Sequence, residues 1–109
     1  MAQKKETGIQ NSIMVALCEK GCKVQRTQSG LFYTPNGDRI RIGRPGVSDL
    51  QGHRSSDGKC FYIETKTPIG KATDKQKKFI KAMQDSNALA GFARSVEDAF
   101  KIVFPEIYD

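Results

Sequence analysis

Three side chains in the middle of the sequence have the types that phosphodiester chemistry requires. Fourteen residues separate Asp49 from the run Glu64-Thr65-Lys66. Side chains alternate between the two faces of a strand, so Glu64 and Lys66 would share one face. Carboxylate oxygens bind Mg²⁺, and a neighbouring ammonium can steady an attacking water and the charge that develops on a phosphate. Two acids and a lysine in this pattern indicate a metal-dependent phosphodiesterase site.

A hairpin signal predicts how Asp49 reaches the other two residues. Asp57-Gly58 is typical of a two-residue type I′ turn. With that turn Asp49 faces Lys66 and Gln51 faces Glu64, and residues on one face of paired strands lie about 7–8 Å apart or closer. A loop with an odd number of residues would turn one strand's side chains to the other face. The alternative is a solvated strand face with a cross-strand Asp–Lys pair, and the spacing alone favours neither interpretation.

Length and charge narrow the class of protein. A chain of 109 residues suits one domain, and 38% hydrophobic with 28% charged residues is typical of a globular fold. No apolar run is long enough for a membrane span or a signal peptide, so we expect no membrane association. The net charge of +6 favours a polyanionic partner such as DNA.

The cysteines argue against a disulfide framework. Cys18, Cys22 and Cys60 are an odd number, which predicts a reducing compartment and a cytoplasmic protein (the host cytoplasm if the protein is viral). A zinc site with His53 is a poor interpretation, because Gly21 is expected to end a helix between the first two cysteines and Cys60 lies within a strand. We expect all three as buried small hydrophobic side chains.

Hydrophobic periodicity predicts the elements that position these residues. Helices are expected over residues 6–20, 74–87 and from Ser95 onward, and strands over residues 23–27, 31–34, 39–42, 61–67 and 90–94, with another through Asp49. The first helix would bury the stripe Ile9, Ile13, Met14 and Leu17. This order predicts an α/β fold, a sandwich in which helices flank a mixed central sheet.

Two polar residues on the predicted helices each have two interpretations. Glu6 lies at the edge of the first buried stripe, where it is either a first-turn residue favoured by the helix dipole or an inward functional group. Gln76 completes a capping box with Thr73. Gln76 also shares a stripe with Phe79 and Ile80 that faces the sheet, where a bound water or phosphate could partner its amide. The two roles of Gln76 are compatible.

Basic residues gather on both sides of the predicted site. Lysines crowd the outer face of the second helix and its approach, and arginines precede the Asp49 strand. A lysine-rich helix face is often simply solvated. Beside a phosphodiester site we favour phosphate contacts, and the candidates are Arg39, Arg41, Arg44, Lys71, Lys75 and Lys78.

These motifs together resemble the VRR-NUC (virus-type replication-repair nuclease) family of the PD-(D/E)XK nucleases, in the compact stand-alone form typical of phages. The matching segments are residues 5–10, 46–50, 62–66, 71–76 and 90–95, so the resemblance covers nearly the whole chain. One departure is Ser48, which stands where the family usually has proline before its aspartate. Proline there shapes the strand entry and binds no metal.

The resemblance implies a fold and a set of roles. It implies one domain over residues 1–109 with a restriction-endonuclease-like αβ sandwich, and five catalytic residues, Glu6, Asp49, Glu64, Lys66 and Gln76. Asp49, Glu64 and the Thr65 carbonyl would bind Mg²⁺ or Mn²⁺. Glu6 would join through the metal or its waters, while Lys66 and Gln76 would position the nucleophile.

The function that the resemblance implies is structure-selective DNA cleavage. A metal-dependent endonuclease of this kind would hydrolyse branched DNA such as Holliday junctions, as a homodimer whose symmetry suits a two-fold substrate. The apolar run Leu31–Tyr33 and the C-terminal Phe104, Ile107 and Tyr108 exceed what a small core needs and are compatible with a dimer.

The alternative is a basic DNA-binding accessory module of a replication or recombination complex, without cleavage of its own. The complete set of acids favours the nuclease, because a pure binder has no need of carboxylates that repel one another.

Overall fold

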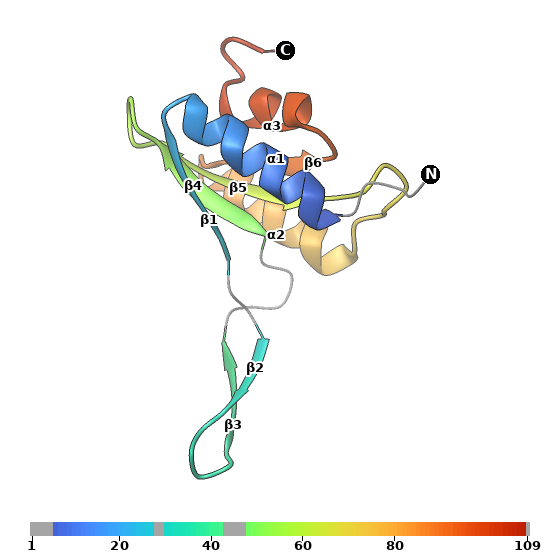
Figure 1. Cartoon of the computed structure of the whole chain (residues 1–109). Coiled ribbons are helices and arrows are strands. Elements are labelled where there is room, and N and C mark those ends of the chain that lie inside the picture. Colours follow the sequence, from blue (N-terminus) through green and yellow to red (C-terminus); the bar gives the residue numbers. More distant parts are fainter. Residues whose placement is uncertain (1–5, 28–29, 43–47, 109) are drawn as a thin grey trace.

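The computed structural model describes residues 6–27, 30–42 and 48–108, with only the backbone at 30–32 and 40–42. The elements follow the predicted order with ends within two residues of those expected (Figure 1). They are α1 (Glu6–Glu19), β1 (Cys22–Arg26), β2 (Gly30–Tyr33), β3 (Arg39–Ile42), β4 (Leu50–Arg54), β5 (Cys60–Thr65), α2 (Asp74–Asp85), β6 (Leu89–Ala93) and α3 (Val96–Val103). No described helix is both long and apolar enough to cross a membrane.

The central sheet is mixed, as predicted. Its strand order is β1-β4-β5-β6, in which β4 pairs antiparallel with both β1 and β5, and β6 runs parallel to β5. The parallel pair is joined through α2, because parallel neighbours need a crossover connection. Strands β2 and β3 do not extend this sheet but form a separate hairpin that projects from it (Figure 1).

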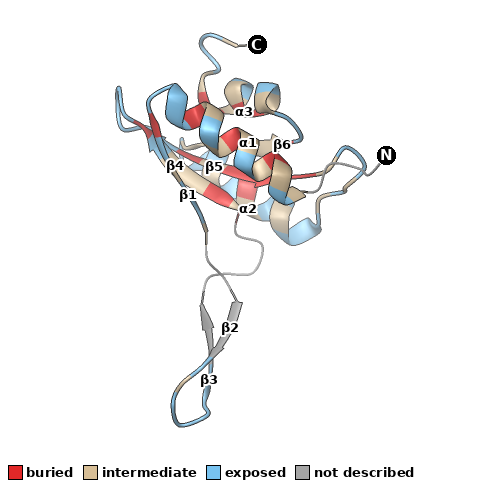
Figure 2. Cartoon of the chain, in the orientation of Figure 1, coloured by how far each residue is buried: buried red, intermediate tan, exposed pale blue. Residues whose placement is uncertain are grey.

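The core lies on the face of the sheet that α1 and α3 cover. Ile9, Ile13 and Leu17 of α1 pack with Phe61 and Ile63 of β5 (Figure 2). Tyr62 lies between Phe61 and Ile63, so its side chain points to the other face of the sheet. There its ring contacts the ring of Phe79 in α2, with centroids 5.7 Å apart. The two helical layers therefore cover opposite faces.

The β4–β5 register corrects the expected pairing. Gln51 lies opposite Tyr62 rather than Glu64, and Leu50 lies opposite Ile63. Extended by one residue, this register places Asp49 opposite Glu64 instead of Lys66. The shift of two residues is even, so every side chain keeps its predicted face.

The cause of the shift is the loop, which has four residues instead of two. The amide of Arg54 donates to the Lys59 carbonyl (3.0 Å), and the amide of Gly58 donates to the Arg54 carbonyl (2.8 Å). The Asp57 carboxylate binds the Lys59 amide and the Arg54 guanidinium. Those contacts stabilise the wider loop, and Gly58 at φ +73° closes it.

The predicted helix ends are present. Gly21 follows α1 at φ +85°. Thr73 and Gln76 form the capping box of α2. The Ser95 hydroxyl accepts from the amide of Asp98 at the start of α3.

Two expectations about apolar side chains were wrong. Cys22 is buried, but Cys18 and Cys60 are exposed. Phe104 and Tyr108 have a place in the fold, because both rings pack with Phe100 at the end of α3.

Candidate active site

Three carboxylates from distant parts of the sequence converge at one end of the sheet. Glu6 begins α1, Asp49 precedes β4, and Glu64 lies in β5; one oxygen of each lies within 4.8 Å of the others. This is the only group of three or more acidic, histidine or cysteine side chains spaced for a metal within the part of the chain that the structure describes.

Glu64 is the buried member of this acidic cluster (Glu6, Asp49 and Glu64). Its exposed fraction is 2%. Burial raises the pKa of its carboxyl to about 9, the neighbouring acids Asp49 and Glu6 act in the same direction, and the Lys66 ammonium opposes them. Its Oε2 is buried and has no hydrogen-bond partner among the described residues.

The donor set fits a divalent cation. Mg²⁺ and Mn²⁺ prefer carboxylate oxygens, and a cation removes the repulsion between acids held this close. The buried Glu64 Oε2 lacks a partner that such an ion would supply. The acidic cluster therefore offers the ligand chemistry that a divalent cation requires.

Asp49 is held in one orientation by the strand beside it. Its Oδ2 accepts from the Thr65 amide (3.0 Å) and from the Thr65 hydroxyl (2.7 Å). The same hydroxyl accepts from Nε2 of Gln10 (3.0 Å), whose Oε1 accepts from Nε of Arg26 (3.1 Å).

Sequence reasoning gave Gln10 and Arg26 no role. Gln10 lies one helical turn after Glu6, so their i, i+4 spacing was the available signal.

Lys66 and Gln76 differ in how closely the structure ties them to the acids. Lys66 is buried next to the site, and its ammonium lowers the pKa of Glu64. The Gln76 amide oxygen accepts from the Thr73 amide (2.9 Å), so the capping role is observed. No hydrogen bond among the described residues links Gln76 to the acidic cluster. The capping box uses the side-chain oxygen of Gln76, so its Nε2 takes no part in the cap.

The basic candidates are only partly described. Lys71, Lys75 and Lys78 are exposed on α2 and its approach, with Lys77 and Lys81 beside them. Arg39 is exposed on the β2–β3 hairpin. Arg44 and the side chain of Arg41 lie outside the described residues.

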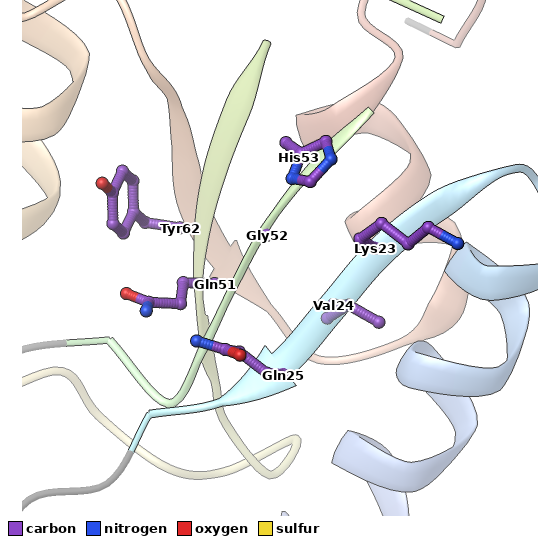
Figure 3. Close-up of a pocket in the computed structure, with 7 residues that line it drawn as sticks. All are labelled: Lys23, Val24, Gln25, Gln51, Gly52, His53 and Tyr62. Atoms are coloured by element: carbon purple, nitrogen blue, oxygen red, sulfur yellow. The ribbon is translucent and has the colours of Figure 1, made fainter. Parts of the chain in front are cut away.

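A hollow of about 340 Å³ lies on the open half of the sheet, away from α1. It is lined by Lys23, Val24, Gln25, Gln51, Gly52, His53 and Tyr62 (Figure 3). Figure 3 shows Gln25, Gln51 and Tyr62 projecting to the same side from three neighbouring strands. Because α2 packs on β5 and β6, this β1–β4 half of the face stays accessible.

Two comparisons with known proteins found matches for this chain. A family model described as the VRR-NUC domain matches residues 17–97, which include Asp49, Glu64, Lys66 and Gln76 but begin after Glu6. A solved structure described as a VRR_NUC domain superposes with a TM-score of 0.66 at 18% identity, over 95% of this chain and 97% of the other. No curated protein matches the chain. With the family model covering most of its length, the chain belongs to the VRR-NUC family of nuclease-type domains.

Proposed function

We propose that this protein is a structure-selective DNA endonuclease, with residues 1–109 forming one catalytic domain. It uses Mg²⁺ or Mn²⁺ to hydrolyse phosphodiester bonds in branched DNA such as Holliday junctions. The observation that carries the proposal is the convergence of Glu6, Asp49 and Glu64 around a buried carboxylate oxygen that has no partner in the described part of the chain. A fold has no structural use for this arrangement, because it places like charges together.

Each residue of the site has a role in the proposal. Asp49, Glu64 and the Thr65 carbonyl hold the ion, and Glu6 contacts it directly or through water. The bound ion supplies positive charge that polarises the phosphate and acidifies a water. Lys66 stabilises the charge that develops on the phosphate, and the Nε2 of Gln76 orients the attacking water.

Basic side chains on the same molecule supply phosphate contacts. Lys75 and Lys78 are exposed along α2, Lys71 is exposed on the segment before it, and Arg39 is exposed on the β2–β3 hairpin. Arg41 and Arg44 belong to the same proposed group by sequence. Lysines and arginines that contact phosphates fix the position of DNA without reading its sequence, which suits an enzyme selective for shape.

A homodimer completes the proposal. A junction offers two equivalent strands, so two active sites related by a two-fold axis would cut it symmetrically. Ile107, 70% exposed, and the exposed Tyr33 are apolar surface that such an interface could cover. Sedimentation at micromolar concentration should give twice the 12.1 kDa chain mass, and a monomer in both free and DNA-bound protein would contradict the symmetric mechanism.

One cleavage experiment tests the function. The protein is incubated with a mobile four-way junction, a flap and a linear duplex, each with Mg²⁺, with Mn²⁺ or with a chelator. We expect cleavage only with a divalent ion and faster on the branched substrates. Asp49→Asn serves as the inactive control, because it keeps the size of the side chain but removes its charge.

Two outcomes would overturn the proposal. Cleavage that persists in chelator would contradict the proposed role of a metal ion. Tight binding of the junction without cleavage under any of these ions would favour the accessory DNA-binding module instead.

A further inference from the structure

A chain of three hydrogen bonds leads from the edge of the sheet to Asp49. Arg26 in β1 donates through Nε to Gln10 in α1 (3.1 Å). Gln10 donates through Nε2 to the Thr65 hydroxyl in β5 (3.0 Å), and that hydroxyl donates to Asp49 Oδ2 (2.7 Å). Arg26 also binds the Asn11 side chain, which fastens it to α1.

The chemistry of Arg26 sets the direction of every proton in this chain. A guanidinium only donates, so Gln10 must turn its oxygen toward Arg26 and its NH₂ toward Thr65. The Thr65 hydroxyl then accepts from Gln10 and has its own proton left for Asp49. With the Gln10 amide reversed, its NH₂ would face the guanidinium, donor against donor.

We propose that Gln10 and Arg26 are positioning residues that act on Asp49 through the Thr65 hydroxyl. They hold that hydroxyl as a donor to Oδ2, which fixes one orientation of the Asp49 carboxylate within the acidic cluster. The inference rests on the metal site of the proposed function. Groups that orient a metal ligand from behind contribute about 10–100-fold in metal affinity or activity when removed.

Metal affinity tests this inference without any need for cleavage. Mn²⁺ binding is measured by calorimetry in the absence of DNA for Gln10→Met and Thr65→Val, which keep side-chain shape but remove the donors. We expect Mn²⁺ to bind roughly 10-fold more weakly to both variants. Thr65→Ser restores the hydroxyl and should restore the affinity.

A matched control separates positioning from general loss of structure. Gln84→Met makes the same change in α2, at a residue outside the acidic cluster. The Gln84 side chain donates to the Ala90 carbonyl (2.9 Å). This variant should leave Mn²⁺ affinity unchanged. In cleavage assays Gln10→Met should lower kcat and leave KM for DNA near its wild-type value. Thermal melts show whether each variant folds. If Gln10→Met does not fold, the comparison of Thr65→Val with Thr65→Ser tests the inference.

The outcomes distinguish this inference from the function on which it rests. Wild-type protein that binds no Mn²⁺ would overturn the metal site and the positioning chain with it. Normal wild-type binding with unchanged affinity in Gln10→Met and Thr65→Val would overturn the positioning chain alone.

The hollow on the open half of the sheet supports a second, independent inference. Gln25 pairs with Gln51, and Gln51 pairs with Tyr62, so the three form one row across β1, β4 and β5. Asp49 lies two residues before Gln51, just ahead of β4, and Glu64 lies two residues after Tyr62 in β5. Two residues of strand span about 6.5–7 Å, so the hollow adjoins the acidic cluster.

A second hollow links the first to the acids. It has a volume of about 380 Å³, shares Gln25 and Gln51, and extends to Arg26 and Thr27. The Thr27 amide donates to the Asp49 carbonyl (2.8 Å), which places this end of the hollow beside the site. The Thr27 hydroxyl is buried with no hydrogen-bond partner among the residues that the structure describes.

The lining has the chemistry of a site for one nucleotide. The residues around the first hollow offer an ammonium, an imidazole, two carboxamides and a phenol ring, and they include no carboxylate. Carboxamides match the edge of a base, an aromatic ring stacks on its face, and a lysine meets its phosphate. A volume of about 340 Å³ is at the small end of ligand pockets and admits a single base, not a duplex.

We infer that this hollow binds one unpaired nucleotide of the DNA substrate, next to the bond that is cut. Tyr62 stacks on the base, Gln25 and Gln51 bind its edge, and Lys23 contacts a phosphate. The inference deepens the proposed function, because a site that only an unpaired nucleotide can enter selects branched DNA over duplex.

Binding in chelator tests the nucleotide site apart from cleavage. Fluorescence anisotropy compares a flap carrying unpaired thymidines with a duplex of the same length. Stacking contributes about 1–3 kcal/mol per base, so Tyr62→Leu should weaken flap binding at least about 5-fold and leave duplex binding unchanged. Gln84→Met, a change on α2 at a residue that lines neither hollow, should not alter the preference for the flap.

Flap and duplex affinities that change equally in Tyr62→Leu, or not at all, would overturn the nucleotide site. If Tyr62→Leu does not fold, Gln25→Ala with Gln51→Ala replaces it with the same expectation. A wild-type protein that binds neither DNA would overturn the proposed function and this inference together.

Discussion

The β4–β5 pair buries an ionisable side chain at each of its two ends, and their surroundings are opposite. At the hairpin end Arg54 is 9% exposed, and Nη1 donates to the Val103 carbonyl (2.9 Å) and to Glu106 (2.7 Å). Nε donates to Asp57 (3.1 Å). At the other end Glu64 is more deeply buried, faces two further acids and has an oxygen without a partner among the described residues.

The difference separates a charge that supports the fold from charges that serve the site. Arg54 ties the hairpin loop to the C-terminal segment, and every contact named above offsets the cost of burying it. Glu64 is buried at a cost that its neighbours increase. Perturbed acids in such surroundings concentrate at functional sites, and this end of the sheet is where the cation is expected to bind.

The largest expected effect comes from removing the buried carboxyl group of Glu64. Glu64→Ala should lower cleavage at least about 100-fold, because it removes a metal ligand that also orients the ion. Metal-free protein should be as stable as wild type or more stable, since one member of a repelling cluster is gone. Cleavage rates and urea unfolding in chelator measure the two effects. Full cleavage activity of Glu64→Ala would show that Glu64 is not part of the active site.

The opposite result is expected at the hairpin end. Arg54→Ala should lower the free energy of unfolding by about 2–4 kcal/mol, because it breaks a buried network, and should leave Mn²⁺ affinity unchanged. Arg94→Ala, which removes an exposed arginine, is the control and should cost far less. Urea unfolding followed by circular dichroism measures both. Equal losses in the two variants would mean that the Arg54 network does not brace the fold.

A third effect follows from the raised pKa of Glu64, about 9 in the folded metal-free protein against an ordinary value of 4.5. Between these values the folded state keeps a proton that the unfolded state releases. Stability should therefore fall as pH rises from about 4.5 to about 9, by at most about 1.4 kcal/mol per pH unit for one proton. Unfolding in chelator at several pH values should show a weaker dependence in Glu64→Gln. If stability depends on pH equally in the wild type and in Glu64→Gln, a group other than Glu64 causes the dependence.

The smallest effect is expected from charges that are not buried at all. Changing exposed Lys75 and Lys78 together to alanine should leave stability within about 0.5 kcal/mol and flatten the salt dependence of DNA binding by roughly 1–2 in the log–log slope. Lys81→Ala is the control, because its ammonium pairs with Asp85 (3.4 Å). An unchanged slope in the double variant would mean that these lysines only solvate the helix.

Local signals in the sequence predicted the elements well. The Ile9, Ile13 and Leu17 stripe, the Thr73–Gln76 capping box and the stop at Gly21 depend on neighbours within one or two turns of chain, and all are present. The hairpin was predicted with the correct faces but the wrong register. The Asp57 side chain contacts the Arg54 guanidinium and the Lys59 amide, and these contacts stabilise the four-residue loop. The Asp-Gly dipeptide alone does not predict them.

The sequence alone predicted that Glu64 and Lys66 share one face of a strand and that Asp49 comes near them, because alternation along a strand is a local rule. It could not place Glu6 or show that Gln10 reaches Thr65, fifty-five residues later in the chain. Those contacts depend on how α1 crosses the sheet, which is set by packing of the whole core. Tertiary structure also decided that Glu64 is buried with one oxygen that has no partner among the described residues, because burial and hydrogen bonding belong to the assembled molecule and not to any segment of it.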